Sequence, residues 1–325
     1  MKILLLGASG LLGHNVLQEL VSRHMSVVAP LRKRDEIVEK MISDTDVVTP
    51  QGSVVDAGFL GDVAKGCDAI INCAGATDMS LRRYEDFVPA NVSLCQNIVD
   101  VAKKHGIKTI VHVSSANTIG YGSKEKPGNE SFPPKEPFAS SLYARSKMAG
   151  EEIMIGYARQ NVDSKIIVLN PGFMIGPYDA KPSSARLMLA GYRLPIMLAP
   201  CGGKSFVAVA DVANAVVNAL DMGRSGERYL LTGEEYTLRD FYLLQARILA
   251  YRQFVISVPR WILFLPAKIG DLLRHMGVAT QLSSSNIRQI TTKEHYSNSK
   301  ACNELAFKPT SIADAIKAYF SWRSK

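Results

Sequence analysis

A tyrosine and a lysine stand four residues apart in the segment LYARSKMAGE, at positions 143 and 147. In a helix, residues at i and i+4 lie on the same face, so Tyr143 and Lys147 can act on the same atom. The same spacing also fits an amphipathic helix whose tyrosine is packed and whose lysine is solvated. The pair alone therefore does not distinguish a catalytic role from a structural one, and the rest of the sequence must show whether a site is present.

A glycine-rich turn near the N-terminus predicts a phosphate site. In MKILLLGASGLLG an apolar β-run ends at Gly7 and a helix is expected to begin near Leu11, which places Gly10 and Gly13 in the turn and the first helical turn. Glycine lets the backbone approach a pyrophosphate, whose charge is stabilised by free N–H groups and by the helix dipole. We expect a dinucleotide to bind here; the alternative is a glycine-rich turn without a ligand.

The end of the second predicted strand indicates which dinucleotide. A carboxylate there would bind the 2′-hydroxyl of NAD, whereas an arginine suits the 2′-phosphate of NADP. The strand SVVAPL leads into Arg32, Lys33 and Arg34, and the first acid is Asp35. This order favours NADP over NAD, the alternative being a solvated basic turn.

The elements that must position these residues form a regular pattern in the first half of the chain. Short apolar β-runs alternate with longer helical patterns, which is typical of a parallel sheet covered by helices. We expect strands at 3–6, 26–31, 46–48, 69–72, 109–114 and 165–169, and helices at 12–23, 84–105 and 144–159. The pattern predicts an α/β fold, a doubly wound parallel sheet of the Rossmann type, with its ligand at the carboxyl ends of the strands.

Beyond this region the alternation becomes irregular and predicts a smaller C-terminal substrate lobe. We expect residues 1–177 to form the dinucleotide-binding domain, joined by a return segment at 205–232. In that segment Asp211 is expected to cap a helix, and 228–232 to add a strand. Residues 178–204 and 233–325 are then expected to form the substrate-binding lobe.

In the order of its motifs the chain resembles the extended short-chain dehydrogenases/reductases, the NAD-dependent epimerase/dehydratase family, over most of its length. Four segments resemble the phosphate loop, the loop behind the cofactor's phosphates and ribose, the strand end with the catalytic serine, and the segment near the nicotinamide: GASGLLG, NCAGAT, VSSANTIG and LNPGFMIGP. The chain departs from the family pattern at Ser53, where an aspartate is usual, and at Asn170, where an arginine is usual.

The resemblance implies which residues form the site. Tyr143 would be the general acid/base, and Lys147 would favour its phenolate and hold the nicotinamide ribose. Ser115 would hydrogen-bond the substrate oxygen during hydride transfer. The cofactor is expected to contact Tyr143 and Lys147, together with Gly7, Ser9, Gly10, Leu11, Gly13, Arg32, Ser53, Val54, Ala74, Gly75, Ala76, Asn91, Pro171, Phe173 and Met174.

The motifs favour a reductase or dehydrogenase of a small hydrophobic ketone, aldehyde or alcohol, closest in pattern to the dihydroflavonol reductase and 3β-hydroxysteroid dehydrogenase branch. VPRWILFLP resembles the apolar C-terminal helix of that branch, and NADP suits net reduction. Lys204 and Ser205 stand where sugar-nucleotide members often carry an Arg-Asp pair. The alternative is a nucleotide-sugar epimerase or dehydratase with bound NAD, its diphosphate clamped by Arg186, Arg193, Lys204 and Arg228. A non-catalytic cofactor sensor is disfavoured, because such proteins typically lack the Tyr-x-x-x-Lys pair.

Composition narrows the partners and the location. The formal net charge is +8, but the longest basic run is RKR, so we expect a small phosphorylated ligand and no nucleic acid. Five cysteines and six scattered histidines fit neither a disulfide framework nor a metal site, and we expect a cytoplasmic protein without a metal. The apolar segment 255–273 is expected to be a substrate-pocket helix, with peripheral membrane contact the less favoured alternative. The family resemblance also implies a homodimer.

Overall fold

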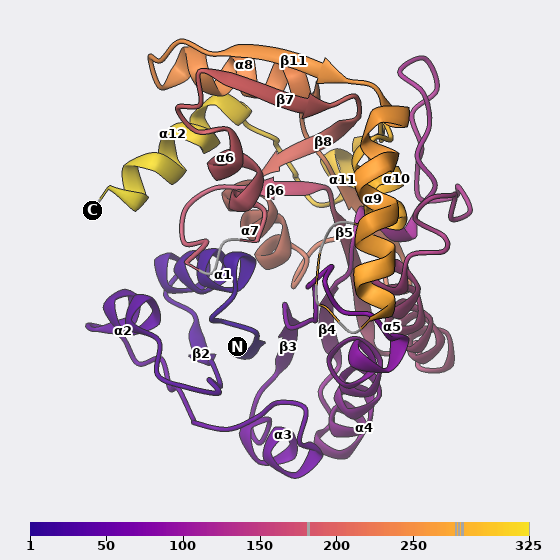
Figure 1. Ribbon diagram of the computed structural model, residues 1–325. Coiled ribbons are helices and arrows are strands. Elements are labelled where there is room, and N and C mark those ends of the chain that lie inside the picture. The colour runs from indigo at the N-terminus through magenta and orange to yellow at the C-terminus, as the bar shows by residue number, and fades with distance from the viewer. Residues whose placement is uncertain (181–182, 277, 279, 281–282, 325) are drawn as a thin grey trace.

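A six-stranded parallel sheet forms the centre of the computed structural model, which describes residues 1–180, 183–276, 278, 280 and 283–324. The strands follow the order β2-β1-β3-β4-β5-β9 (Figure 1). Their bounds are β1 Lys2–Leu6, β2 Ser26–Val28, β3 Ala69–Asn72, β4 Thr109–Val113, β5 Lys165–Pro171 and β9 Arg228–Leu231. The order reverses between β1 and β3, the kind of switch point at which doubly wound folds bind their ligands. The predicted α/β fold is therefore confirmed.

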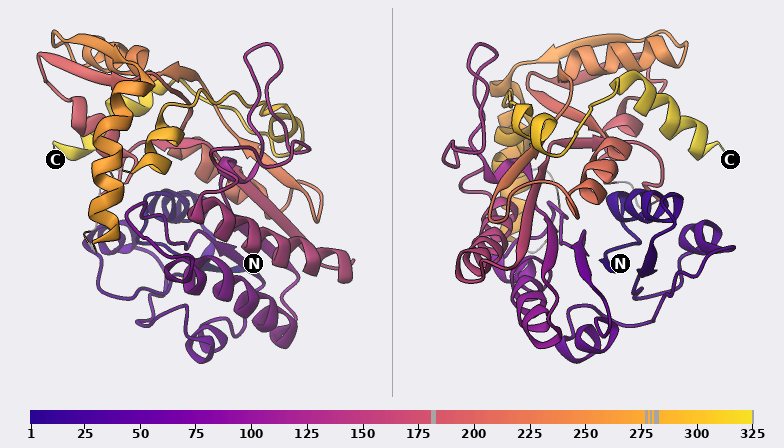
Figure 2. Two further views of the ribbon diagram at one scale, coloured as in Figure 1. Left: turned by 45° about the vertical axis from the view of Figure 1, so that its right-hand side comes forward. Right: turned by 180° about the vertical axis from the view of Figure 1, so that it is seen from behind.

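Helices cover both faces of this sheet because its strands are apolar on both faces. In β1, Ile3 and Leu5 belong to one hydrophobic core and Leu4 and Leu6 to the other. Helices α1 (Leu11–Ser22), α2 (Glu36–Ile42), α7 (Val209–Asn218) and α11 (Ser299–Glu304) contribute to the first core. Helices α3 (Ala57–Val63), α4 (Leu94–His105) and α5 (Leu142–Gln160) contribute to the second (Figure 2).

Two smaller sheets lie beyond the carboxyl edge of the large one (Figure 1). One has the order β10-β8-β6 and the other pairs β11 with β7. Their bounds are β6 Phe173–Ile175, β7 Ile196–Pro200, β8 Gly203–Ala208, β10 Glu235–Thr237 and β11 Phe254–Val258. The helices here are α6 Ala185–Gly191, α8 Leu238–Ile248, α9 Arg260–His275, α10 Ser284–Ile290 and α12 Ile312–Arg323. The core of this part is aromatic, with Phe206 stacked on Phe241 at 4.5 Å between ring centroids.

The predicted strand at 46–48 is wrong, and the one at 26–31 is shortened. Pairing beyond β2 is reduced to isolated bridges between Val28 and Val48 and between Leu31 and Gln51. Pro30 and Pro50 lie within this stretch. Because proline has no N–H, a ladder that crosses these positions loses hydrogen bonds and ends early.

The predicted helix at 84–105 is interrupted, and the predicted cap at Asp211 is wrong. A 3₁₀ turn at Tyr84–Asp86 and a π-helical turn at Pro89–Ser93 precede α4. Asp211 lies inside α7, whose N-cap is Ala208. Its carboxylate instead accepts hydrogen bonds from the backbone N–H and the hydroxyl of Thr310, at 2.6 and 2.9 Å. It therefore ties the C-terminal part of the chain to α7.

Two glycines of α5 allow a matched test of how closely this helix packs. A Cβ atom at Gly150 would lie 2.4 Å from the backbone oxygen of Asn91, whereas one at Gly156 would meet no described atom within 4 Å. We predict that Gly150→Ala lowers the free energy of unfolding by about 1–3 kcal/mol through overpacking. Gly156→Ala should raise it by up to about 1 kcal/mol, because alanine favours the helix. Urea denaturation of both variants is the measurement, and equal stability of Gly150→Ala and wild type would contradict the close approach.

Candidate active site

The loop between β1 and α1 is held close to the loop that follows β3. Gly7 has a φ of +84°, and a Cβ atom there would lie 2.6 Å from the backbone nitrogen of Ala74. A Cβ atom at Gly13 would lie 1.9 Å from the carbonyl oxygen of Gly7. No described side chain caps the first turn of α1, which follows Gly10, so its N–H groups remain available to an anion. Ser9 and Leu11 lie in the same turn, and these features fit the pyrophosphate of a dinucleotide.

The chain after β2 presents two cations without a partner. Arg32 and Lys33 are exposed, and neither has an ion pair among the residues that the structure describes, whereas Arg34 pairs with Glu39. The Oδ1 atom of Asp35 accepts the backbone N–H groups of residues 37 and 38 and contacts Nε2 of His14 at 3.2 Å. The acid nearest this strand end is therefore engaged in capping α2.

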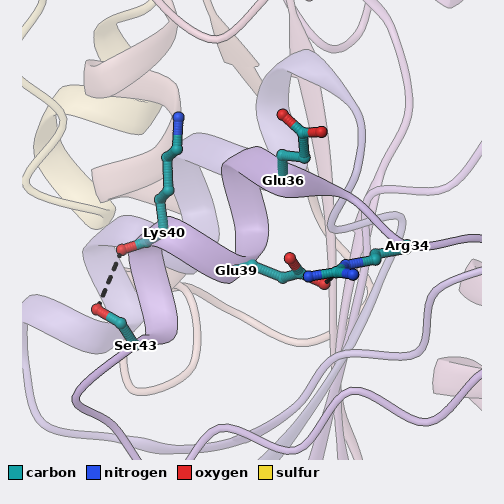
Figure 3. Close-up of a pocket in the computed structure, with 5 residues that line it drawn as sticks. All are labelled: Arg34, Glu36, Glu39, Lys40 and Ser43. Atoms are coloured by element: carbon teal, nitrogen blue, oxygen red, sulfur yellow. Dashed lines mark hydrogen bonds and ion pairs between the residues drawn. The ribbon is translucent and has the colours of Figure 1, made fainter.

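The predicted adenine-side residues Ser53 and Val54 lie beside this turn. The backbone N–H of Gly52 donates to the carbonyl oxygen of Leu31 at 2.9 Å, which places Ser53 close to Arg32. A separate open cavity on the outer side of α2 is lined by Arg34, Glu36, Glu39, Lys40 and Ser43 (Figure 3). Because α2 and α5 lie on opposite sides of the molecule (Figure 1), that cavity is remote from Tyr143 and Lys147.

Asn91 connects the loop after β3 to the helix that carries the Tyr-Lys pair. Its Oδ1 atom accepts the N–H of Ala76 at 2.8 Å, and its Nδ2 atom donates to the Ala76 carbonyl at 3.0 Å. Nδ2 also donates to the Ser146 hydroxyl on α5 at 2.9 Å. Asn91 thereby fixes the loop formed by Ala74, Gly75 and Ala76 relative to α5, from the π-helical turn at Pro89–Ser93.

Ser115, Tyr143 and Lys147 come together at the carboxyl end of β4. The Ser115 hydroxyl lies near the Tyr143 phenol and lowers its pKa. The Nζ atom of Lys147 is buried and donates to the carbonyl oxygen of Val113 at 2.7 Å. A Cβ atom at Gly75 would lie 3.3 Å from Nζ, so the ammonium also borders the loop after β3. An ammonium has three donors, and this site uses one of them for Val113.

The pKa of the Tyr143 phenol is raised, whereas the motif predicted that Lys147 would lower it. Burial raises its pKa above the ordinary tyrosine value, the hydrogen bond with Ser115 lowers it, and the buried Glu151 raises it again. Burial also lowers the pKa of Lys147. Desolvation, the largest cause, therefore sets the direction of the Tyr143 shift, and the lowering expected from Lys147 is not among its causes. The phenol is protonated at neutral pH and is set to donate a proton.

A buried carboxylate next to this site escaped the sequence analysis. Glu151 accepts hydrogen bonds from the Thr118 hydroxyl at 2.7 Å and from Nδ2 of Asn170 at 2.6 Å. Arg228 lies 3.7 Å from its other oxygen. Asn170 also donates to the carbonyl oxygen of Ser115 at 3.2 Å, so the group holds Ser115 in place. The spacing of Glu151, one helical turn after Lys147 on the same face, was the signal available in the sequence.

The residues after β5 pack partly into the neighbouring cores. Phe173 meets Phe206 edge to face at 5.4 Å between centroids, and Met174 packs against the core of the first sheet face. Pro171 ends β5 and is buried. These residues join the large sheet to the smaller one at the edge where the site lies.

Two of the residues considered as a diphosphate clamp are engaged elsewhere. Lys204 forms an ion pair with the buried Glu294 and donates to the carbonyl of Gln289 at 3.3 Å. Arg228 pairs with Glu151 and donates to the carbonyl of Glu130 at 2.8 Å. Among the described residues, no group of three His, Cys, Asp or Glu side chains is placed to hold a metal ion.

Residues 3–232 match the NAD dependent epimerase/dehydratase family. The chain is 25% identical to sterol demethylase protein B of Methylococcus capsulatus, over 99% of this chain and 98% of that protein. It is 25% identical to a putative dihydroflavonol 4-reductase of Synechocystis, over 97% and 92%. It is 24% identical to a dTDP-glucose 4,6-dehydratase of Mycobacterium tuberculosis, over 72% and 73%. The crystal structure of gox2253 superposes with a TM-score of 0.83 at 25% identity, covering 99% of this chain and 98% of that one.

The family match contains the glycine loop, the Ser-Tyr-Lys group and the residues that surround it. The chain therefore belongs to the NAD-dependent epimerase/dehydratase family, the extended short-chain dehydrogenases/reductases, and is an NAD(P)-dependent enzyme of that family.

Proposed function

We propose that this enzyme is an NADP-dependent reductase that transfers a hydride to the carbonyl carbon of a small hydrophobic ketone or aldehyde, or runs the same reaction backwards on the alcohol. The observation that carries the proposal is the half-buried Tyr143, whose phenol has a raised pKa, lies near the Ser115 hydroxyl and shares a helical face with Lys147. These groups are what proton transfer to a carbonyl oxygen requires.

Each residue then has a separate task. The cofactor, when bound, supplies the hydride. The glycine loop and the first turn of α1 would hold its pyrophosphate, and Lys147 would hold the nicotinamide ribose with the donors that Val113 leaves free. Ser115 would donate to the substrate oxygen, and Tyr143 would pass its proton to that oxygen as negative charge develops. In the alcohol-oxidising direction the phenolate would take the proton back.

The charges in the turn after β2 support NADP over NAD as the cofactor. Arg32 and Lys33 are exposed cations with no ion pair among the described residues, and a 2′-phosphate offers them an anionic partner. Asp35 would be needed to bind the 2′-hydroxyl of NAD, but its Oδ1 atom already accepts two backbone N–H groups and contacts His14. Both features support NADP.

Two cations that could bind a diphosphate are already paired with carboxylates, which favours a substrate without a diphosphate. Lys204 and Arg228 would have to leave buried carboxylate partners to bind a diphosphate. The names of the Methylococcus and Synechocystis relatives refer to a sterol and to a dihydroflavonol, both largely apolar compounds. A nucleotide-sugar epimerase or dehydratase with bound NAD is the second candidate, favoured by the dTDP-glucose 4,6-dehydratase relative.

We predict that Arg32→Ala weakens NADPH binding by about 10- to 100-fold and leaves NADH binding nearly unchanged, because a hydrogen bond to a charged group contributes about 1.5–3 kcal/mol. Nucleotide fluorescence titration measures both constants. Arg34→Ala is the matched control, since Arg34 already pairs with Glu39, and should have a small effect on either nucleotide.

The same titration separates the two candidate functions. Tight NADPH binding without thermal stabilisation by UDP-glucose is the result expected of the reductase. Copurified NAD together with stabilisation by UDP-glucose would overturn both the cofactor and the substrate assignment.

We predict that Tyr143→Phe lowers the turnover of an accepted ketone or aldehyde by about 10²- to 10⁴-fold, the usual contribution of a general acid. The phenylalanine keeps the ring that packs near Phe87, so the melting temperature and NADPH affinity should stay close to those of wild type. A folded variant with near wild-type turnover would remove Tyr143 from the mechanism.

The pH dependence follows from the raised pKa of Tyr143. Because reduction needs the protonated phenol, the turnover of reduction should stay level through neutral pH and fall only in alkaline solution, above the ordinary tyrosine pKa of about 10. Oxidation of the alcohol needs the phenolate and should rise over the same range. Ser115→Ala should move both limbs to higher pH, because the Ser115 hydrogen bond lowers this pKa. A reduction rate that falls between pH 6 and 8 would contradict the assignment.

A further inference from the structure

The helix α9 carries a row of large apolar side chains on its outer surface. Their exposed fractions are high for residues of this type: Trp261 71%, Leu265 66%, Ile269 60%, Leu272 59% and Met276 63%. In the left view of Figure 2, the lower half of α9 lies at the outline of the molecule. Exposed apolar area of this extent in one place indicates a contact surface.

The spacing of these residues puts them on a single face. They occur at i, i+4, i+8, i+11 and i+15, which is one stripe of an α-helix. The opposite face contains the buried Ala267 and Gly270 and packs on α10, where Asp271 accepts the backbone N–H of Ser284 at 3.0 Å. The helix is therefore attached through its small residues and leaves its large ones outside.

The two-stranded sheet that leads into α9 extends the apolar surface. β11 ends at Val258, and α9 begins two residues later. Phe254 lies beside Ile196, and Ile256 beside Leu198, in the parallel register of β11 and β7. All four are exposed, at 68%, 60%, 42% and 61% respectively, because the sheet packs on α8 through its other face. We call these four residues, the four on α9 and Met276, which directly follows it, the apolar face.

The charges around the apolar face are mainly basic. Arg252, Arg260 and Lys268 are exposed, and Arg252 and Lys268 have no ion pair among the described residues. Between positions 252 and 276 the sequence has four basic residues and one acid, Asp271, which is engaged with α10. A partner for this surface must therefore combine apolar groups with negative charge.

We propose that the apolar face docks on a membrane that contains anionic lipids, with α9 lying in the interface. A helix with aliphatic residues and a tryptophan on one side and basic residues at its margin is the form that such interfacial helices take. A second copy of this chain is a poorer partner, since a symmetric contact would bring the same basic margins together. No helix among the described residues is long and apolar enough to cross a membrane, so the proposed contact is peripheral.

The chain offers a direct optical test of this contact. It has two tryptophans, and Trp261 is exposed while Trp322 packs against Tyr178 and Tyr319. In the full-length Trp322→Phe protein, Trp261 is the sole indole. On adding vesicles of phosphatidylcholine with one third phosphatidylglycerol, its emission should shift to shorter wavelength and be quenched by brominated lipid chains. Vesicles of phosphatidylcholine alone should bind more weakly.

Matched variants separate the apolar and the charged contributions. Leu265→Gln/Ile269→Gln should reduce vesicle binding in a flotation assay by at least about tenfold. Val48→Gln/Val162→Gln replaces two other exposed apolar residues, at 54% and 89% exposure, and should leave binding unchanged. Arg260→Gln/Lys268→Gln should weaken binding to anionic vesicles on the order of twentyfold, whereas Lys103→Gln/Lys104→Gln on α4 should not.

Three results would overturn the proposal. The first is no binding to either kind of vesicle by a protein with a normal melting curve. The second is equal binding by the α9 variants and their controls. The third is a dimer in lipid-free sedimentation that dissociates in Leu265→Gln/Ile269→Gln, because a second copy or another protein, and not lipid, would then be the partner of the apolar face.

Discussion

The buried polar face of α5 is the constraint on which the rest of the site depends. Tyr143, Lys147 and Glu151 follow one another at intervals of one helical turn on one face of α5, where Lys147 and Glu151 are buried. A charge taken out of water is tolerated only when it is paired and hydrogen-bonded. Three strands supply the partners: the carbonyl oxygen of Val113 at the end of β4 accepts from Lys147, Nδ2 of Asn170 in β5 donates to Glu151, and Arg228 at the start of β9 lies opposite the same carboxylate. The catalytic geometry and the stability of the central strands therefore rest on the same contacts.

Close packing of α5 makes these contacts possible. At Gly150 the helix approaches the backbone of the π-helical turn that carries Asn91, and Asn91 in turn fixes the loop containing Gly75. The Lys147 ammonium lies next to that glycine. The two close approaches, Gly7 to Ala74 and Gly75 to Lys147, thus place the loop after β3 between the glycine loop and α5.

The sequence predicted the parts of this arrangement that depend on local spacing. The strand, the glycines and the following helix occur in order at the N-terminus, and the Tyr-Lys pair needs only a helical turn to become a unit. It could not predict parts that depend on the order of strands in space. Glu151 and Arg228 meet only because β9 adds to the sheet beside β5, whereas from the sequence Arg228 was considered only as part of a diphosphate clamp. The raised pKa of Tyr143 also depends on burial, which no motif encodes. The predicted strand at 46–48 failed where prolines end the ladder.

For the apolar segment near residue 260, too, the sequence pattern does not show how the segment packs. The sequence marks the segment as apolar, but only the packed structure reveals that small residues face inward and large ones outward. The inner side of α9 rests on α10, whose Asn286 donates to the carbonyl of Met79 at 3.4 Å, just beyond the loop that borders Lys147. The proposed docking face is therefore linked, through α10, to the chain that follows the loop bordering Lys147. Under the proposed function and the proposed docking, the lipid surface and the candidate site would thus be connected by one set of packed elements.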